Sequence, residues 1–290
     1  MRQYRIITDA TADLEQCDVE KWDLTVIPME VRMEDKTWLF DPQQKELKID
    51  DFYAMIREGK LASTTQINAA VYSEYFEQAL SNGEDVLYIC FSSGLSGTLQ
   101  SAMLAARELE EKYPQGRVVC LDSLAASCGL GFLTIMAAKH KAQGLSLEET
   151  TAKLEEERHH ISHWFTVKDL QYLRRGGRIS AAAAAFGTML AIKPIMHVDN
   201  EGHLIPMEKA KGMKKALRAI VDHSMENYCP EVEPMLAIVH SDAPDEAEQL
   251  AQMLREKTGR QEICIRKLGP VITAHTGVGT LAVFAYGKQK

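Results

Sequence analysis

Short hydrophobic runs alternate along the chain with segments whose apolar residues recur every three to four positions. The first pattern predicts buried strands and the second predicts amphipathic helices. In the first half, strands are expected at Tyr4–Thr8, Leu24–Met29, Val31–Leu39, Asp85–Phe91 and Arg117–Asp122. Helices are expected at Asp50–Glu58, Val71–Leu80, Ser96–Lys112 and Ala126–Lys141. This alternation predicts a mostly parallel sheet covered by helices on both faces, with Leu24–Met29 and Val31–Leu39 paired as a hairpin.

The second half begins after a helix that connects two predicted domains. Gly144 is a helix stop and Ser146 an N-cap, so this helix should run to about His160. Further strands are expected at Trp164–Val167, Ile192–Val198 and Leu204–Met207. We therefore predict an α/β protein with two domains, an N-terminal one at residues 1–162 and a smaller C-terminal α/β domain at residues 163–290.

Composition narrows the class of protein. The 290 residues are 46% hydrophobic and 26% charged, which is typical of a globular chain with a large core. The net charge of -8 argues against a nucleic-acid-binding protein. No signal peptide and no apolar run long enough for a transmembrane segment is recognisable, so a cytoplasmic protein is expected. The cysteines form no CxxC pair and are predicted to be reduced core residues: Cys17, Cys90, Cys120, Cys128, Cys229 and Cys264.

The loop from Phe91 to Thr98 has the most informative composition. It follows a predicted buried strand, precedes a helix and contains Ser92, Ser93, Gly94 and Ser96. Hydroxyls, free backbone N–H groups and a helix N-terminus suit an anion such as a carboxylate or phosphate. Ordinary capping of the helix is an equally good explanation of this loop.

Known catalytic and cofactor motifs do not fit the chain. Gly94–Thr98 places threonine where the last glycine of a nucleophile elbow belongs, which disfavours a serine hydrolase. There is no phosphate-binding P-loop. Gly277–Ala282 matches G-x-G-x-x-A but has no βαβ unit after it. The histidines have no metal-ligand spacing, so no metal site and no cofactor is expected; His163, just beyond a helix end, is expected to be exposed.

Three further polar clusters could bind a ligand. Ser63–Asn68 could be a capping turn, or its hydroxyls could face Ser92 and Ser93 of the Phe91–Thr98 loop. Leu173–Ser180 has two glycines that allow close backbone approach and three arginines, which could instead be solvated. His275 lies among small residues in an apolar stretch and is a candidate ligand contact.

Five motifs in order resemble the DegV family of bacterial fatty-acid-binding proteins over nearly the whole chain. These motifs are Ile7–Leu14, Thr64–Gln66, Ser92–Thr98, Gly176–Ser180 and His275–Gly279. The resemblance implies that one long-chain fatty acid is held between the two domains, its tail buried. It also implies a partner, a separate ATP-dependent fatty acid kinase that makes the acyl phosphate for phospholipid metabolism. The family's usual proline is replaced by Ile67, which affects the path of the Thr64–Asn68 loop.

Carried over by motif, Thr64 and Ser93 are the implied carboxylate contacts, and Arg175 and His275 complete the polar network. The implied ligand-binding set is Thr64, Thr65, Ser92, Ser93, Gly94, Arg175, His275 and Thr276. Small alanines at 181–185 suggest a tail tunnel beside a helix, although these residues could equally form ordinary core. The predicted tunnel residues are Phe165, Phe186, Met189, Leu190, Ile192 and Ile195.

Charge reverses locally in this acidic chain. Residues 170–218 contain nine Lys and Arg against three acids, a net of +6. A predicted surface helix with Lys211, Lys214 and Lys215 could dock an acidic partner, or it could be an ordinary solvated face.

Three functions remain open from the sequence. The first is a fatty-acid carrier without turnover of its own. The second is an acyl-transfer or hydrolytic enzyme that uses Ser93 with His275. The third is an interaction or regulatory protein in which the lipid is structural.

Overall fold

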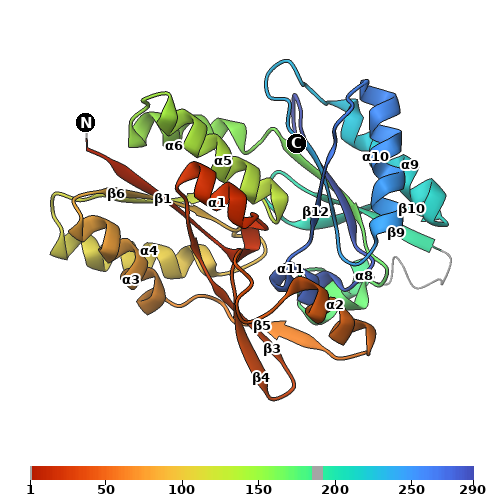
Figure 1. Ribbon diagram of the computed structural model, residues 1–290, viewed down its shortest axis with the longest axis horizontal. Helices are drawn as coiled ribbons and strands as arrows, with labels where there is room; N and C mark the ends of the chain where they lie inside the picture. The colour runs from red at the N-terminus through yellow and green to blue at the C-terminus, as the bar shows by residue number, and fades with distance from the viewer. Residues whose placement is uncertain (1, 185–191) are drawn as a thin grey trace.

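The computed structural model describes residues 2–184 and 192–290 and confirms an α/β protein with a parallel sheet flanked by helices and a second sheet domain (Figure 1). No helix in these two ranges is long and apolar enough to cross a membrane. Residue 163, taken as the domain boundary from the sequence, lies inside a strand of the second sheet, β8 (Ile161–Thr166).

The first sheet has the order β2-β1-β6-β7 and is parallel throughout. Its strands are β1 (Tyr4–Asp9), β2 (Thr25–Ile27), β6 (Asp85–Cys90) and β7 (Val118–Asp122). All six residues of β6 are buried, as expected for a strand covered on both faces. The helices that cover this sheet are α1 (Gln16–Trp22), α3 (Ala69–Ser81), α4 (Thr98–Lys112), α5 (Cys128–Ala142) and α6 (Leu147–Glu157). In Figure 1, α3 and α4 lie on one face and α1, α5 and α6 on the other.

The predicted hairpin was wrong in its pairing. Residues Thr25–Ile27 join the parallel sheet beside β1, and the hairpin forms one strand later, between β3 (Met29–Met33) and β4 (Lys36–Phe40). Pro28 separates the two strands, because proline has no N–H for a sheet ladder. The hairpin and β5 (Ala62–Thr64) form a small antiparallel sheet, with α2 (Ile49–Arg57) beside it.

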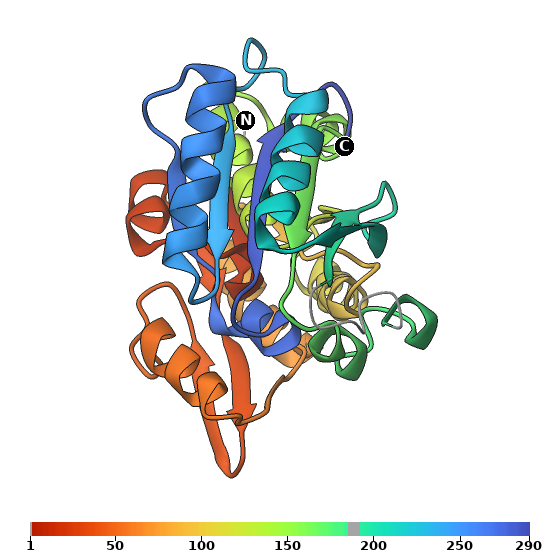
Figure 2. The same cartoon turned by 90° about the vertical axis from the view of Figure 1, so that its right-hand side faces the viewer.

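The second sheet has the order β10-β9-β8-β13-β11-β12 and is antiparallel except for its last pair. Its remaining strands are β9 (Ile192–Val198), β10 (Leu204–Lys211), β11 (Leu236–His240), β12 (Cys264–Lys267) and β13 (Leu281–Tyr286). Figure 2 looks onto α9 (Met213–Glu226) and α10 (Pro244–Thr258), which cover the outer face. The inner face is turned toward the first domain, and the short elements near its edge are η1 (Ala10–Ala12), α7 (Gln171–Arg175), α8 (Ala181–Ala184) and α11 (Pro270–Thr276).

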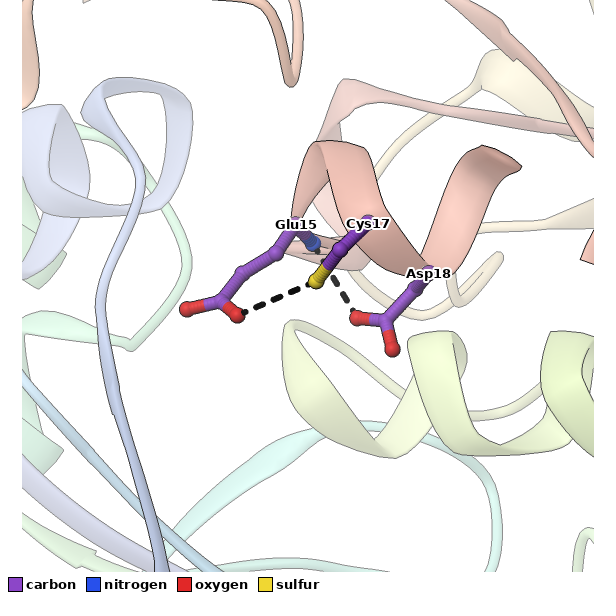
Figure 3. A group of neighbouring side chains, drawn as sticks. All are labelled: Glu15, Cys17 and Asp18. Carbon is purple, nitrogen blue, oxygen red and sulfur yellow. Dashed lines mark hydrogen bonds between the residues drawn. The ribbon is translucent and has the colours of Figure 1, made fainter. Parts of the chain in front are cut away.

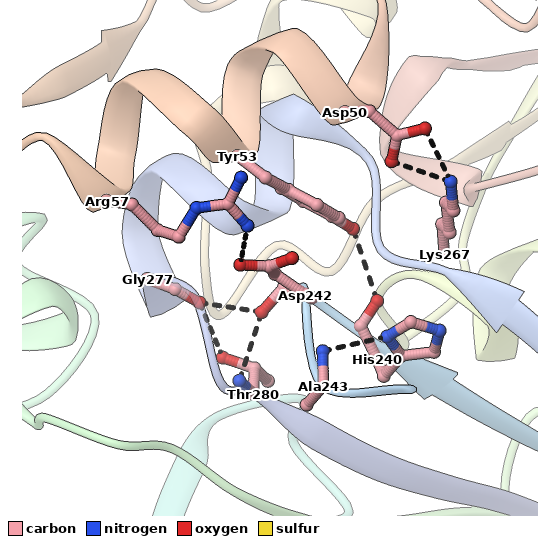
Figure 4. A network of polar contacts seen from close by, with 10 residues as sticks. Asp50, Tyr53, Arg57, His240, Asp242, Ala243, Lys267, Gly277 and Thr280 are labelled. Carbon is pink, nitrogen blue, oxygen red and sulfur yellow. Dashed lines mark hydrogen bonds and ion pairs between the residues drawn. The ribbon is translucent and has the colours of Figure 1, made fainter. Parts of the chain in front are cut away.

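A polar network joins α2 to the second domain (Figure 4). The Tyr53 hydroxyl donates to the carbonyls of Leu268 (2.6 Å) and His240 (3.2 Å), and its side chain is buried. Asp50 pairs with Lys267, and Arg57 pairs with Asp242, in the same network. The network fixes the segment that leads into α11.

We expect Tyr53→Phe to lower the free energy of unfolding by about 0.5–1.5 kcal/mol, because the buried hydroxyl loses its hydrogen bonds while both carbonyls keep another donor. Urea denaturation measures the change. Tyr75→Phe is the matched control, since the half-buried Tyr75 hydroxyl makes no hydrogen bond within the described residues. Equal stability of the Tyr53→Phe variant and the wild type would show that the hydroxyl contributes nothing to this junction.

The cysteines are all free, but two departed from the expectation of core positions. Cys17 and Cys264 are exposed on α1 and β12, whereas Cys90, Cys128 and Cys229 are buried and Cys120 is intermediate. Both lie in short elements without any buried residue, so no core position is available to them there.

Candidate functional site

A cavity of about 340 Å³ lies between the two domains. It opens at the carboxyl ends of the parallel strands, the usual place for a ligand in an open α/β sheet. Its polar lining side chains are Thr11, Thr64, Gln66, Ser96, Thr98, Ser127, His163, Arg178, His275, Thr276 and Thr280. Its apolar lining comprises Met29, Phe91, Leu95, Ala126, Phe165, Leu173, Val198, Leu204, Leu268, Val271, Ile272, Ala282 and Phe284.

The polar end of the cavity is built around Thr64 and His275. Thr64 is the last residue of β5, His275 lies in the last turn of α11, and Thr64 Oγ1 is 2.8 Å from His275 Nε2. Burial, followed by the charges of Arg178 and Arg175, lowers the pKa of His275 to about 4. At neutral pH the pair therefore presents uncharged hydrogen-bonding groups to the cavity.

His275 is expected to remain neutral down to acidic pH. The pKa of about 4 in the folded protein lies below the ordinary histidine value of about 6.5, so neutral His275 contributes stability that is complete above about pH 6.5. This contribution is lost as the pH falls from 6.5 through 4. An NMR titration of the His275 ring signals in the ligand-free protein should give a midpoint near 4, and a midpoint near 6.5 would contradict the buried, cation-flanked environment.

Arg178 brings a positive charge to the same end. Its Nε donates to Leu95 O (3.0 Å) and its Nη1 donates to Gly176 O, while Nη2 has no partner in the described part of the chain. The side chain is half-buried, and desolvation lowers its pKa. No carboxylate pairs with Arg178 within residues 2–184 and 192–290. A desolvated cation without an acid beside it favours an anionic ligand.

Hydroxyls further along the lining are already engaged. Thr11 donates to Asp9, Ser127 donates to Asp13, and Thr280 donates to Gly277 O. These groups have no spare proton for a ligand. Ser96 Oγ and Thr98 Oγ1, 2.6 Å apart at the start of α4, are the additional hydroxyls near the mouth, where Gln66 and Gly97 are exposed.

The structure brings only part of the predicted ligand-binding set together. Thr64, His275 and Thr276 line the cavity, and Ser92, Ser93, Gly94, Thr65 and Arg175 do not. Ser93 is exposed, because the loop turns its side chain outward while its N–H donates to Asp122. The interpretation of Ser93 as a carboxylate contact therefore does not fit this geometry.

The remaining members of that set have structural contacts. Ser92 Oγ donates to Gly202 O (2.8 Å) in the β9–β10 turn. A Cβ on Gly94 would come within 3.0 Å of Gly202, so glycine allows this close packing of the two domains. Arg175 is exposed, with its guanidinium 4.7 Å from the Tyr172 ring centre.

Only some of the predicted tunnel residues line the cavity. Phe165 lines the cavity. Ile195 does not, because alternation along β9 turns it toward the outer core under α9, while Val198 faces the cavity. Ile192 is half-buried outside the lining. Phe186, Met189 and Leu190 lie outside the described residues.

Sequence reasoning missed several lining residues. Arg178 was inside a recognised motif but was passed over for Arg175, and Ser96 was passed over for Ser93. His163 was expected to be exposed on a helix end, but α6 stops at Glu157 and His163 is a buried residue of β8. The strand alternation of residues 161–166 was the available signal.

One group of side chains has donor atoms close enough for a metal ion. Glu15, Cys17 and Asp18 have donor atoms within 4.8 Å of one another (Figure 3). Their grouping follows from the start of α1, where Asp18 accepts the Glu15 N–H and also pairs with Arg266 (2.7 Å). These contacts explain the cluster without a ligand.

Comparison with known proteins identifies the family. The DegV family, described as uncharacterised proteins, matches residues 3–288. A DegV domain-containing protein of Clostridium perfringens is 40% identical over 290 residues, covering 100% of this chain and 99% of that protein. A DegV family protein from Thermus thermophilus, described as binding fatty acid, is 30% identical with a TM-score of 0.84 over 99% of this chain and 100% of that chain. DegV from Bacillus subtilis, a fatty acid binding protein, is 29% identical with a TM-score of 0.84 over 99% of this chain and 100% of that chain. The chain belongs to the DegV family.

Proposed function

We propose that this protein is a carrier that binds one long-chain fatty acid in the interdomain cavity. The carboxylate lies against Thr64, His275 and Arg178, and the tail occupies the apolar remainder. The observation that carries this assignment is Arg178, a half-buried guanidinium on the cavity wall without an acidic partner in the described chain. The fatty acid binding described for the Thermus thermophilus and Bacillus subtilis relatives supports it.

The distribution of polarity favours a fatty acid over a fully polar anion. Spare donors concentrate at one end, while the hydroxyls deeper in the lining donate to protein groups. Aromatic and aliphatic side chains dominate the rest of the cavity wall. Such a wall stabilises an alkyl chain by removing it from water, at about 0.8 kcal/mol per methylene.

The same geometry disfavours turnover by this chain alone. A nucleophile needs a general base within hydrogen-bond reach, and that base is usually oriented by a third group. His275 reaches Thr64, but in the described residues no carboxylate contacts its Nδ1, against which Gly176 packs. A pKa of about 4 makes His275 a weak base at neutral pH.

Organic extraction of the purified protein followed by mass spectrometry tests the proposal. A free long-chain fatty acid, in about equal molar amount to the protein, is the expected result. An acyl group covalently attached to Thr64 or Ser93 would instead support the enzyme. Absence of any lipid, both as purified and after incubation with free fatty acid, would overturn fatty-acid binding.

We further propose that the bound acid is presented to a separate ATP-dependent kinase. The polar end adjoins the exposed Gln66 and Gly97, so a partner could reach the carboxylate there while the tail stays buried. The phosphate donor would belong to the partner, because this sequence has no P-loop.

We propose that Lys211, Lys214 and Lys215 help that partner dock. The sequence predicted one surface helix for all three lysines. In the structure Lys211 is the last residue of β10, and only Lys214 and Lys215 lie on α9. All three are exposed and form no ion pair within the described ranges. Helix α9 covers the outer face of the second sheet, and none of the three lysines lines the cavity.

Changing Lys211, Lys214 and Lys215 together to Glu should spare fatty-acid binding but slow acyl phosphate formation with the kinase partner. The reversed charge removes the attraction that orients an acidic partner, and added salt should slow the wild type in the same direction. Measured rates at low and high ionic strength check both statements. Wild-type rates for the triple variant at every salt concentration would mean that this surface is simply solvated.

A further inference from the structure

The inner face of the second sheet carries the cavity lining in two rows. Strands β8 and β13 are antiparallel, and their register pairs Phe165 with Ala282 and His163 with Phe284. Paired residues on neighbouring strands point to the same face, and all four line the cavity. We call Phe165 and Ala282 the near row, and His163 and Phe284 the far row.

The two rows differ in their distance from the polar end. Strand β13 begins five residues after Thr276, the end of the helix that carries His275, so Ala282 comes before Phe284 on the way from that helix. Strand β8 runs the other way and ends just before α7, so Phe165 is nearer than His163 to Arg178. Two residues of strand separate the rows by about 7 Å.

The far row closes the cavity. The far row extends onto the next two strands. Because Trp164 is paired with His197, His163 lies beside Val198 of β9. Val198 is in turn paired with Leu204 of β10. The next inward pair along the same strands, Ile161 and Tyr286, packs in the core shared with α5 and α6 and does not line the cavity. The space available to a ligand therefore ends at the far row.

His163 is held rigidly in that row. Its Nδ1 lies 3.0 Å from Ile161 O, its Nε2 lies 3.5 Å from the Ala126 N–H nitrogen, and its ring meets Phe284 edge-on at 5.1 Å. A Cβ on Gly129 would lie 2.1 Å from His163 Nε2, so α5 packs directly behind the ring. Burial keeps the pKa of His163 well below its usual value, and the ring is neutral.

We infer that the far row is a chain-length stop, against which the terminal methyl group of the acyl chain rests. Ala282 in the near row leaves the passage open because it has the smallest side chain that a strand can place there. The inference rests on the proposed fatty-acid site and adds its specificity: the protein selects straight acyl chains by length, at the end remote from the carboxylate. A packed wall rejects a single surplus methylene by roughly 10- to 200-fold.

The test uses the full-length protein, stripped of lipid and offered an equimolar mixture of straight saturated acids from decanoic to eicosanoic acid. Mass spectrometry of the protein-bound acids reports the preferred length. Ala282→Leu should shift the preference to shorter acids, because leucine fills the passage one row earlier. Phe284→Ala should shift it to longer acids, with at least about tenfold enrichment over the wild type.

Val283→Ala is the matched control, because Val283 is buried on the opposite face of β13 and its truncation leaves the cavity unchanged. Phe284→Leu is a milder truncation that answers the same question if Phe284→Ala does not fold. If Ala282→Leu and the folded Phe284 variant bind acids with the wild-type length distribution, the far row is not the stop. Failure of the proposed function itself is distinguishable, since the wild type would then bind none of the acids.

Discussion

Arg178→Met should weaken fatty-acid binding strongly. Methionine keeps an unbranched apolar stem but removes the cation that faces the cavity. Removing one partner of a hydrogen-bonded charge pair costs about 2–5 kcal/mol when the pair is buried. Arg178 is half-buried, so the lower end applies, a loss of about 30-fold in affinity. Titration calorimetry with a long-chain fatty acid measures the change.

Two further variants isolate the role of the charge. Arg178→Lys keeps the positive charge but loses the planar contact with Leu95 O, so it should fall between the wild type and Arg178→Met. Arg175→Met removes an exposed charge that lies over Tyr172, outside the cavity lining, and should change affinity little. Equal losses in Arg175→Met and Arg178→Met would contradict a specific carboxylate contact and point to long-range charge alone.

The fold was largely predictable because its driving pattern is local. Buried parallel strands such as β6 read as continuous apolar runs, and the helices between them have a clear apolar face. The error at Leu24–Met29 arose where two strands follow one another with only Pro28 between them. Hydrophobicity marks both strands, but the choice of partner depends on which sheet edge is free, which is a tertiary property.

The site was predictable in its motifs but not in its individual side chains. Thr64 and His275 are 211 positions apart, and only the resemblance to the family placed them in one site. Within single motifs the predicted residues and those that line the cavity differ, because Ser93 and Ser96 are separated by the turn of a loop. Arg175 and Arg178 differ similarly, since Gly177 adopts a φ of 74° between them and redirects the chain. The amino-acid composition of a motif does not show which of its side chains point into the cavity.

Thr64→Val should lower fatty-acid affinity by about 10- to 140-fold while leaving the fold intact. Valine matches the shape of threonine but cannot donate to the carboxylate, and a hydrogen bond to a charged group is worth about 1.5–3 kcal/mol. The same change leaves His275 Nε2 without its partner at 2.8 Å, which adds to the loss. Affinity is measured by calorimetry, and thermal unfolding verifies that the variant is folded.

The neighbouring residues supply two controls for this change. Thr65→Val makes the identical substitution one position later, on a half-buried side chain outside the cavity lining, and should leave affinity near the wild-type value. Ser93→Ala should do the same, because the Ser93 side chain is exposed. A large loss in Ser93→Ala together with an unchanged Thr64→Val would place the carboxylate at Ser93 and away from the polar end formed by Thr64, His275 and Arg178. A loss confined to Thr64→Val, in contrast, ties the ligand to the hydroxyl at the end of β5.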